Sequence, residues 1–225
     1  MRFHLVTCDM LLRPMAHLVA ASPHEIVLRD LSASLHAEPR SLGERIQGAV
    51  DMVETDDPTA DAVLLGYGLC GGATAGIVAR GRPVVLPRAH DCATILLGSR
   101  GRYEREHETT PGTYWFTEDN VRRGDALKGW LLGDAGRSDA VEATRRDWTE
   151  RFGEDNAEYL MTTLGEWQRH YERGAFLDTG LGTADEAGPV DGADLTAGAA
   201  AAEALAESER RGWRFERVAA DLGLL

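Results

Sequence analysis

The stretch AVLLGYGLCGG, residues 62–72, joins a run of apolar residues to a turn that places one cysteine among four glycines. A short, uninterrupted apolar run bounded by turn residues is typical of a strand that is buried on both faces, as in a parallel sheet. Glycine lets the backbone bend sharply or approach another group closely. We therefore expect a buried strand at 62–65, followed by a turn that lies against a phosphate, a metal or another segment of the chain.

Similar apolar runs occur on both sides of this stretch, at 2–7, 25–29 and 83–86. Apolar residues at helical spacing predict helices over 10–20, with Pro14 in the first turn, and over 42–53; residues 93–103 also have helical character. Strands that alternate with helices in this way form βαβ units, in which the strands run parallel. The predicted fold class is α/β, with a mostly parallel, doubly wound sheet.

For the C-terminal half, the sequence predicts fewer strands and more helix than for the N-terminal half. Strands are expected at 113–116, 175–178 and 213–218, a helix at 199–211, and a loop over the Gly-, Asp- and Ala-rich residues 180–198. Residues 119–173 are charged and helical in character, and we interpret them as a helical lid or subdomain within one α/β domain that covers 1–225. The side chains expected to pack this lid are Trp130, Trp148, Phe152, Tyr159, Leu160 and Trp167.

The composition of the chain argues against several classes of partner and location. The formal net charge is −13 and no Lys/Arg cluster interrupts the acidity, so a nucleic-acid partner is not expected. No apolar run approaches the roughly 20 residues that cross a bilayer, so no membrane partner is expected. Asp9 and Arg13 interrupt any signal-peptide core, which predicts a cytoplasmic location. In a reducing compartment the three cysteines are expected to be free thiols or metal ligands rather than disulfides.

The three cysteines follow three different predicted strands. Cys8 comes after RFHLVT, Cys70 after AVLLGYGL and Cys92 after PVVLPRAHD. Parallel strands place their carboxyl ends on one edge of the sheet, where ligands bind in open α/β folds. We therefore predict that the three thiols converge in one cleft. The alternative is that each cysteine separately fills a tight turn, as small buried residues do.

Converging thiols suit three kinds of chemistry. They could bind zinc, with His90 or a water as fourth ligand. They could hold three irons of a [4Fe–4S] cluster, leaving the fourth iron open for substrate. A metal-free thiol nucleophile with His90 as its base is the third option. We favour the cluster, because glycines around Cys70 leave room for an inorganic core and expose N–H groups to its sulfides. The glycines assigned to this role are Gly68, Gly71 and Gly72.

The surrounding polar residues extend this hypothesis. His90 is assigned as fourth ligand or general acid/base, while Arg88 and His36 are assigned as substrate contacts. Asp91 is expected to cap the helix that follows it. The glycines also fit G-x-G-x-x-G, a spacing that cradles a pyrophosphate in dinucleotide-binding folds. No acidic ribose partner stands about 20 residues further on, which makes this match weak.

The chain resembles a known family, Domain of Unknown Function 1638, found in bacteria and archaea. The resemblance rests on LLGYGLCGG, on LPRAHDC with LLGSR after it, on PGTYW at 111–115, and on the early Cys8, LHAEP at 35–39 and FLDTGL at 176–181. It implies cysteines at these three positions, with His36 and His90 alongside. The family has no settled activity, and the resemblance implies an association with corrinoid and one-carbon methyl-transfer systems.

Two functions are compatible with these patterns. The first is a metalloenzyme, a lyase, desulfurase or transferase, that acts on a small metabolite at a three-cysteine site. With zinc in place of the cluster, thiolate methyl transfer would be the natural reaction. The second is a non-catalytic accessory protein that binds a metal or cofactor for a corrinoid methyltransferase partner.

Overall fold

The computed structural model describes residues 1–122, 139–165, 170–181 and 197–225. These residues form two compact units. Unit 1 contains Met1–Glu108, Leu177–Thr183 and Val218–Leu225, and unit 2 contains Thr109–Phe176 and Ala184–Arg217. The earlier assignment of one domain with a helical lid over 119–173 stays a prediction.

Unit 1 is built on a parallel sheet of four strands in the order β2-β1-β3-β4. The strands are β1 (Arg2–Cys8), β2 (Glu25–Leu31), β3 (Ala62–Gly66) and the short β4 (Val84–Val85). They occur where the apolar runs predicted them and all point the same way. The α/β fold class is confirmed, and so is the common carboxyl edge on which the site prediction depends.

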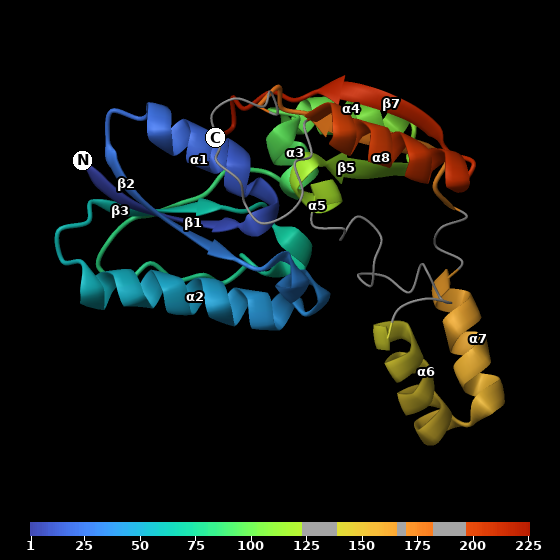
Figure 1. The fold of residues 1–225 in the computed structure, drawn as a ribbon. Coiled ribbons are helices and arrows are strands. Elements are labelled where there is room, and N and C mark those ends of the chain that lie inside the picture. Colours follow the sequence, from blue (N-terminus) through green and yellow to red (C-terminus); the bar gives the residue numbers. More distant parts are fainter. Residues whose placement is uncertain (123–138, 166–169, 182–196) are drawn as a thin grey trace. The chain divides into compact units, whose positions relative to one another are not determined.

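Two helices cover unit 1 from opposite sides of its sheet (Figure 1). They are α1 (Leu12–Ala21), with Pro14 in its first turn, and α2 (Pro39–Asp56), which begins with Pro39. A proline is well placed there because the first turn needs no backbone N–H donor. The buried stripe of α2, which packs on β1 and β3, consists of Leu42, Ile46, Ala49, Val50 and Val53.

The helix expected over 93–103 is two helices, α3 (Cys92–Leu96) and α4 (Arg100–Thr109). The break contains Gly98, whose φ is +69°, a backbone conformation that glycine adopts readily. A Cβ on Gly98 would lie 2.6 Å from the carboxyl carbon of Asp221. A close approach from the distant C-terminal segment therefore interrupts a sequence that otherwise has helical character.

Unit 2 is described by itself. Its sheet has the strand order β5-β6-β7, and these strands are Thr113–Thr117, Arg173–Asp178 and Arg214–Ala219. The helices α5 (Glu118–Arg122) and α8 (Ala197–Arg210) contact each other. Its core contains Phe116, Phe176 and Trp213, and the indole of Trp213 stacks on Tyr114 with a centroid distance of 5.7 Å.

The predicted aromatic packing of residues 119–173 is seen only in part, since Trp148 and Leu160 are half-buried. Helices α6 (Asp139–Phe152) and α7 (Glu154–Gly165) contact each other, but Phe152 and Tyr159 are 44% and 68% exposed. Trp130 and Trp167 lie outside the described residues. Aromatic periodicity here was therefore a poor guide to burial.

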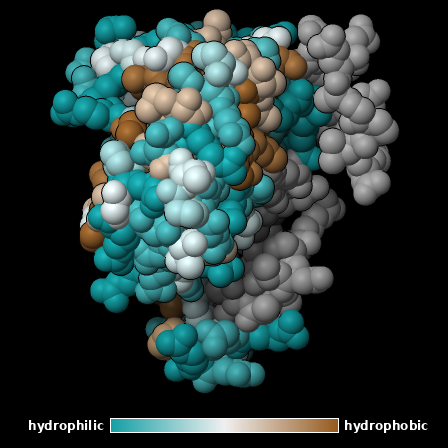
Figure 2. All heavy atoms as spheres, turned by 90° about the vertical axis from the view of Figure 1, so that its left-hand side faces the viewer, coloured by the Kyte–Doolittle hydropathy of each residue, from teal (hydrophilic) through white to brown (hydrophobic). Residues whose placement is uncertain are grey.

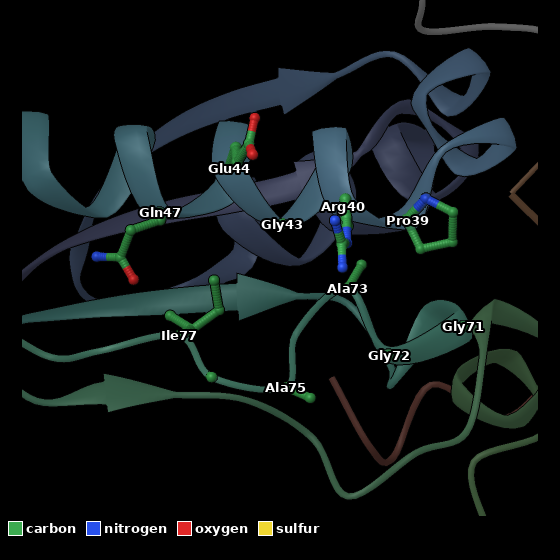
Figure 3. A pocket seen from close by; sticks show the side chains of 11 residues that line it. Pro39, Arg40, Gly43, Glu44, Gln47, Gly71, Gly72, Ala73, Ala75 and Ile77 are labelled. Carbon is green, nitrogen blue, oxygen red and sulfur yellow. The ribbon is translucent and has the colours of Figure 1, made fainter.

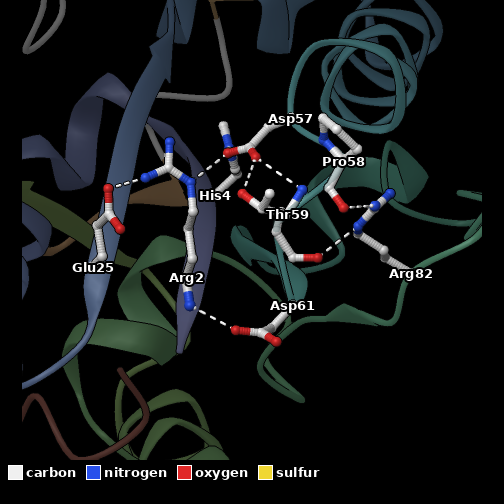
Figure 4. Close-up of polar contacts among 9 residues, drawn as sticks. Arg2, His4, Glu25, Asp57, Pro58, Thr59, Asp61 and Arg82 are labelled. Carbon is white, nitrogen blue, oxygen red and sulfur yellow. Dashed lines mark hydrogen bonds and ion pairs between the residues drawn. The ribbon is translucent and has the colours of Figure 1, made fainter.

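A polar network ties together the amino edge of the unit 1 sheet (Figure 4). The Asp57 carboxylate accepts hydrogen bonds from Arg2 Nε at 2.6 Å and from Thr59 Oγ1 at 2.7 Å, and lies 2.8 Å from His4 Nε2. The bonds from His4, Thr59 and Arg2 hold the pKa of Asp57 well below its usual range. Figure 2 shows this side of the molecule as mainly hydrophilic, broken by smaller hydrophobic patches.

Replacing Ile46 with alanine is expected to lower the free energy of unfolding of unit 1 by about 2–5 kcal/mol, because the side chain is fully buried and its removal leaves a cavity. Urea unfolding, followed by hydrogen exchange of β1 and β3 amides, measures this. The matched control is Met52→Ala on the exposed part of the same helix, which should change the stability far less. Equal losses in both variants would contradict the packing described for α2.

Candidate functional site

Each cysteine lies at or shortly after the carboxyl end of a strand of unit 1. Cys8 is the last residue of β1, and its sulfur accepts a hydrogen bond from the Met10 N–H at 3.5 Å. Cys70 follows β3 and opens the short 3-10 helix η3 (Cys70–Gly72). Cys92 is the first residue of α3, directly after β4 and its loop. All three are free thiols.

The glycine-rich turn lies against another segment of backbone, the loop that carries His90 and Asp91. The Leu69 N–H donates to the Ala89 carbonyl and the Cys70 N–H to the His90 carbonyl, each at 3.0 Å. A Cβ on Gly68 would lie 2.7 Å from the Asp91 nitrogen, so only glycine permits this approach. The turn therefore joins the segment that carries Cys70 to the segment that carries Cys92.

Gly71 and Gly72, the other two glycines assigned to a cofactor, have a different setting from Gly68. Both have positive φ, +67° and +93°, and both line an open groove of about 520 Å³ between α2 and the chain after η3 (Figure 3). Arg40, Glu44 and Gln47 of α2 also line this groove. No cysteine is among the residues that line this groove.

The thiols of Cys8 and Cys70 are near enough to Cys92 to affect its pKa. Burial raises the pKa of Cys92, and the neighbouring Asp91, Cys8 and Cys70 raise it further. Burial and Asp91 raise the pKa of Cys70 to about 11. A hydrogen bond with the Gly68 backbone acts in the opposite direction but does not outweigh them. Interactions of this kind fall off with distance. The shifts therefore support the predicted convergence of segments that lie far apart in sequence.

Two further residues belong to this edge although the sequence analysis did not select them. Asp9 is buried beside Cys8, and its Oδ1 accepts the Ala33 N–H at 2.8 Å. Tyr67, from the glycine-rich turn, is only 1% exposed and packs in the same core cluster as Cys8 and Cys70. Asp9 directly follows Cys8, and Tyr67 lies in the same turn as Cys70, so their places in the sequence could have identified them. We call these residues, with the three cysteines and His36, the carboxyl-edge cluster.

His36 lies in η2 (Ala33–Ala37) and stacks on Tyr67, with ring centroids 6.4 Å apart. Burial lowers its pKa, although the Ala33 carbonyl and the Asp9 carboxylate act in the opposite direction. The ring is therefore neutral at physiological pH. Its Nδ1 lies 3.1 Å from the Ala33 carbonyl oxygen. Because a carbonyl only accepts, Nδ1 carries the proton and Nε2 carries the lone pair.

His90 and Arg88 lie on the exposed part of the same loop. The His90 side chain is 67% exposed, with Nδ1 at 3.3 Å from Asp91 Oδ2 and the ring stacked on Tyr103. Arg88 is exposed and forms no hydrogen bond or ion pair within the part of the chain that the structure describes. Asp91 caps α3 as predicted, since its Oδ1 accepts the Thr94 N–H at 2.8 Å. The assigned roles of His90 and Arg88 stay predictions.

Comparison with known proteins identifies the family. The model of a family described as "Protein of unknown function (DUF1638)" matches residues 31–225. The chain belongs to the DUF1638 family. No curated protein and no solved structure matches it. The match contains Cys70, Cys92 and His36, whereas Cys8 and Asp9 precede it.

Two further findings concern the described residues of this DUF1638 protein. Among the described residues, no group of three or more His, Cys, Asp or Glu side chains is arranged so that it could hold a metal ion. No helix of that same part of the chain has the length and apolar character to cross a membrane. The thiols of the carboxyl-edge cluster are thus near one another without forming a coordination sphere.

Replacing Gly68 with alanine is expected to lower the free energy of unfolding by about 1–3 kcal/mol, because the new Cβ would force the backbone at Asp91 away. Gly48→Ala in the interior of α2 is the control. Nothing lies within 4 Å of a Cβ there, so alanine should be neutral or stabilise by about 0.5–1 kcal/mol. Equal effects at the two positions would show that the turn does not press against the His90–Asp91 loop.

In the metal-free protein, Cys70 is expected to react slowly with iodoacetamide at pH 8. A pKa of about 11 in place of the ordinary 9.0 lowers its thiolate fraction about a hundredfold below pH 9. Alkylation of this peptide, followed by mass spectrometry, should therefore still accelerate between pH 9 and pH 11. In urea, the alkylation rate of the same thiol should stop rising above about pH 9, because the unfolded cysteine has its ordinary pKa. Coincident folded and unfolded profiles would contradict burial as the cause of the shift.

Proposed function

We propose that this protein is an enzyme that acts on a small metabolite at a [4Fe–4S] cluster bound by Cys8, Cys70 and Cys92. The observation that carries the proposal is the placement of the three cysteines after three parallel strands that share one carboxyl edge, together with the effect of two thiols on the third. Both Cys8 and Cys70 raise the pKa of Cys92, although the three residues come from different strand ends. This edge is where open α/β folds bind their ligands.

The charges around the thiols favour a cation as the bound group. Among the described residues, the charged groups that shift the pKa values of Cys70, Cys92 and Tyr67 are acids and thiols, including Asp9, Asp30 and Asp91. A nucleophilic cysteine normally has a lowered pKa because positive groups surround it. Here Cys70 and Cys92 keep their protons, and binding a metal is what would displace them. This setting supports metal ligation over a metal-free thiolate nucleophile.

The number of thiols favours a cluster over a single zinc ion. One ion requires all its ligands in one coordination sphere, with Zn–S bonds of about 2.3 Å. In a cluster each cysteine ligates a different iron, so the three sulfurs stand further apart. Three cysteines supply ligands for three irons and leave the fourth iron open, so a cluster requires no further residue. When bound, such a cluster supplies a Lewis-acidic iron with one open coordination position.

The residues of the chain itself would provide the remaining functions. Neutral His36, with its lone pair on Nε2, would accept a proton from a substrate held at this edge. Arg88, exposed and without an ion pair in the described residues, would contact an anionic substrate group. His90 would act as an acid or base at the exposed rim of the site rather than as a ligand, because its side chain is 67% exposed.

Anaerobic purification followed by iron, zinc and acid-labile sulfide analysis tests the proposal. The expected result is about four irons and four sulfides per chain. Cys8→Ala, Cys70→Ala and Cys92→Ala should each lose most of this iron, whereas Leu69→Ala, next to Cys70 but 45% exposed, should retain it. A colourless protein with about one zinc per chain, or cysteine variants that keep their iron, would overturn the proposal.

A further inference from the structure

The groove between α2 and the chain after η3 is lined by an arginine that has no partner in the described part of the protein. Figure 3 shows the Arg40 guanidinium pointing from α2 towards the segment that contains Gly72 and Ala73. Its side chain forms no hydrogen bond or ion pair with any described residue. Glu44 also lines the groove, but its carboxylate points away from that segment (Figure 3). The groove therefore presents a positive charge that the described contacts do not neutralise.

The segment opposite Arg40 leaves its backbone open. Gly72 and Gly76 line the groove with positive φ, +93° and +88°, and no described atom lies within 4 Å of a Cβ built on either residue. Gly68 differs, because its Cβ would meet the Asp91 nitrogen at 2.7 Å. Glycine at 72 and 76 is therefore not explained by close contact with another described segment. It suits the left-handed backbone and also lets a bound group approach that backbone closely.

Contacts between the two walls hold the groove in shape. Gln47 of α2 accepts the Val78 N–H at 2.8 Å and donates to the Val78 carbonyl at 3.1 Å. A Cβ on Gly43 of α2 would lie 2.8 Å from the Ala73 carbonyl oxygen, so glycine is what lets the helix and the segment approach there. Both walls belong to unit 1. The groove is therefore a feature of the packed unit and is formed before any ligand binds.

One end of the groove lies at the N-terminal turn of α2, a helix of 18 residues. The first turn of a helix has N–H groups without an intrahelical partner and carries a partial positive charge. Glu38, the N-cap residue, makes no capping hydrogen bond, and its carboxylate accepts the Ser41 hydroxyl at 2.8 Å instead. Pro39 and Arg40, the next two residues, line the groove. The helix end and the Arg40 charge therefore act in the same direction, towards binding of an anion.

We propose that this groove, which we call the α2 groove, binds the phosphate group of a small metabolite. The guanidinium of Arg40 offers a fork of N–H donors that matches two phosphate oxygens. The open backbone at Gly72 and Gly76 lets the phosphate come close to the opposite wall. The volume of about 520 Å³ leaves room for the rest of a small metabolite. This site lies apart from the roles assigned to the cysteines, so it does not rest on the proposed function.

Two other occupants fit the α2 groove less well. A metal ion needs several His, Cys, Asp or Glu ligands, which the described residues do not group together, and the Arg40 charge would repel it. A dinucleotide bound through the G-x-G-x-x-G spacing would use Gly66, Gly68 and Gly71. Gly66 and Gly68, however, are packed against other segments and do not line the groove. The phosphate is therefore assigned to Arg40 and the later glycines, not to that motif.

Calorimetric titration of the full chain with pyrophosphate tests the inference, at low ionic strength because salt screens exposed charges. The wild type should bind, and Arg40→Gln should weaken binding at least about tenfold, because it removes charge-assisted hydrogen bonds. Glu44→Gln should bind about twofold more tightly, because a neighbouring carboxylate repels the phosphate. Arg45→Gln is the matched control, since Arg45 is exposed on the same helix but does not line the groove. It should bind as the wild type does.

Three results of this titration would overturn the inference. The first is a wild-type protein that binds no pyrophosphate at millimolar concentration. The second is an equal loss in Arg40→Gln and Arg45→Gln, which would indicate unspecific attraction to any exposed arginine. The third is acetate bound as tightly as inorganic phosphate, which would show that the groove does not select phosphate. Urea unfolding of each variant verifies that a loss of binding is not a loss of fold.

Amide NMR spectra of the same titration locate the ligand. The signals of Gly72 and Gly76, which line the groove, should shift with added pyrophosphate. Gly48, which belongs to α2 but does not line the groove, should stay unchanged. Shifts at Cys92 in place of these glycines would put the anion at the thiols and would contradict the inference.

This inference and the proposed function fail in different ways. Cys92→Ala should bind pyrophosphate as tightly as the wild type, because no cysteine lines the α2 groove. A wild-type protein that takes up no iron but binds pyrophosphate through Arg40 would refute the cluster alone. A protein that loads iron normally but binds no pyrophosphate would refute the phosphate site alone.

Discussion

The parallel pairing of β1 with both β2 and β3 is the interaction on which unit 1 depends. Cys8 at the end of β1 is paired with Leu31 of β2, and Thr7 with Gly66 of β3. These two ladders bring the ends of three strands to one edge, although the helices α1 and α2 separate the strands along the chain. Gly66 leaves room for this pairing, because a Cβ there would lie 2.4 Å from Thr7 Oγ1.

The two edges of this sheet have opposite electrostatic character. At the amino edge, Asp57 is satisfied by Arg2, His4 and Thr59, and its charge is compensated. At the carboxyl edge, acids and thiols lie together around Tyr67, whose hydroxyl has no described partner. The first arrangement stabilises the fold, whereas the second costs stability. This contrast is the physical reason for placing the site at the carboxyl edge.

Sequence patterns predicted the elements of unit 1 because its strands and helices are defined locally. The apolar run of β3 and the buried stripe of α2 are both visible as periodicities. The break at Gly98 depends on Asp221, a residue too distant for local patterns to reveal. The exposure of Tyr159 likewise depends on what α7 packs against, which the aromatic spacing did not specify.

The candidate site was predictable to the extent that it follows from topology. Strand ends placed Cys8, Cys70 and Cys92 on one edge, and a helix-cap preference identified Asp91. The sequence did not decide whether the turn at Gly68 lies against a ligand or against another segment of backbone. In the structure it lies against backbone, because the turn hydrogen-bonds to the Ala89 and His90 carbonyls and a Cβ on Gly68 would clash with Asp91. Tyr67 was missed because an unsatisfied hydroxyl is a property of packing, which no spacing of residues encodes.

The raised pKa values of the cysteines also bear on oxidation. Peroxide and other oxidants attack the thiolate rather than the thiol, and they must reach the sulfur to do so. Cys8 is buried, and burial keeps Cys70 and Cys92 protonated at physiological pH. Cys70 and Cys92 are therefore expected to react slowly with oxidants while the chain is folded. Exposed thiols with lowered pKa values would instead be oxidised readily.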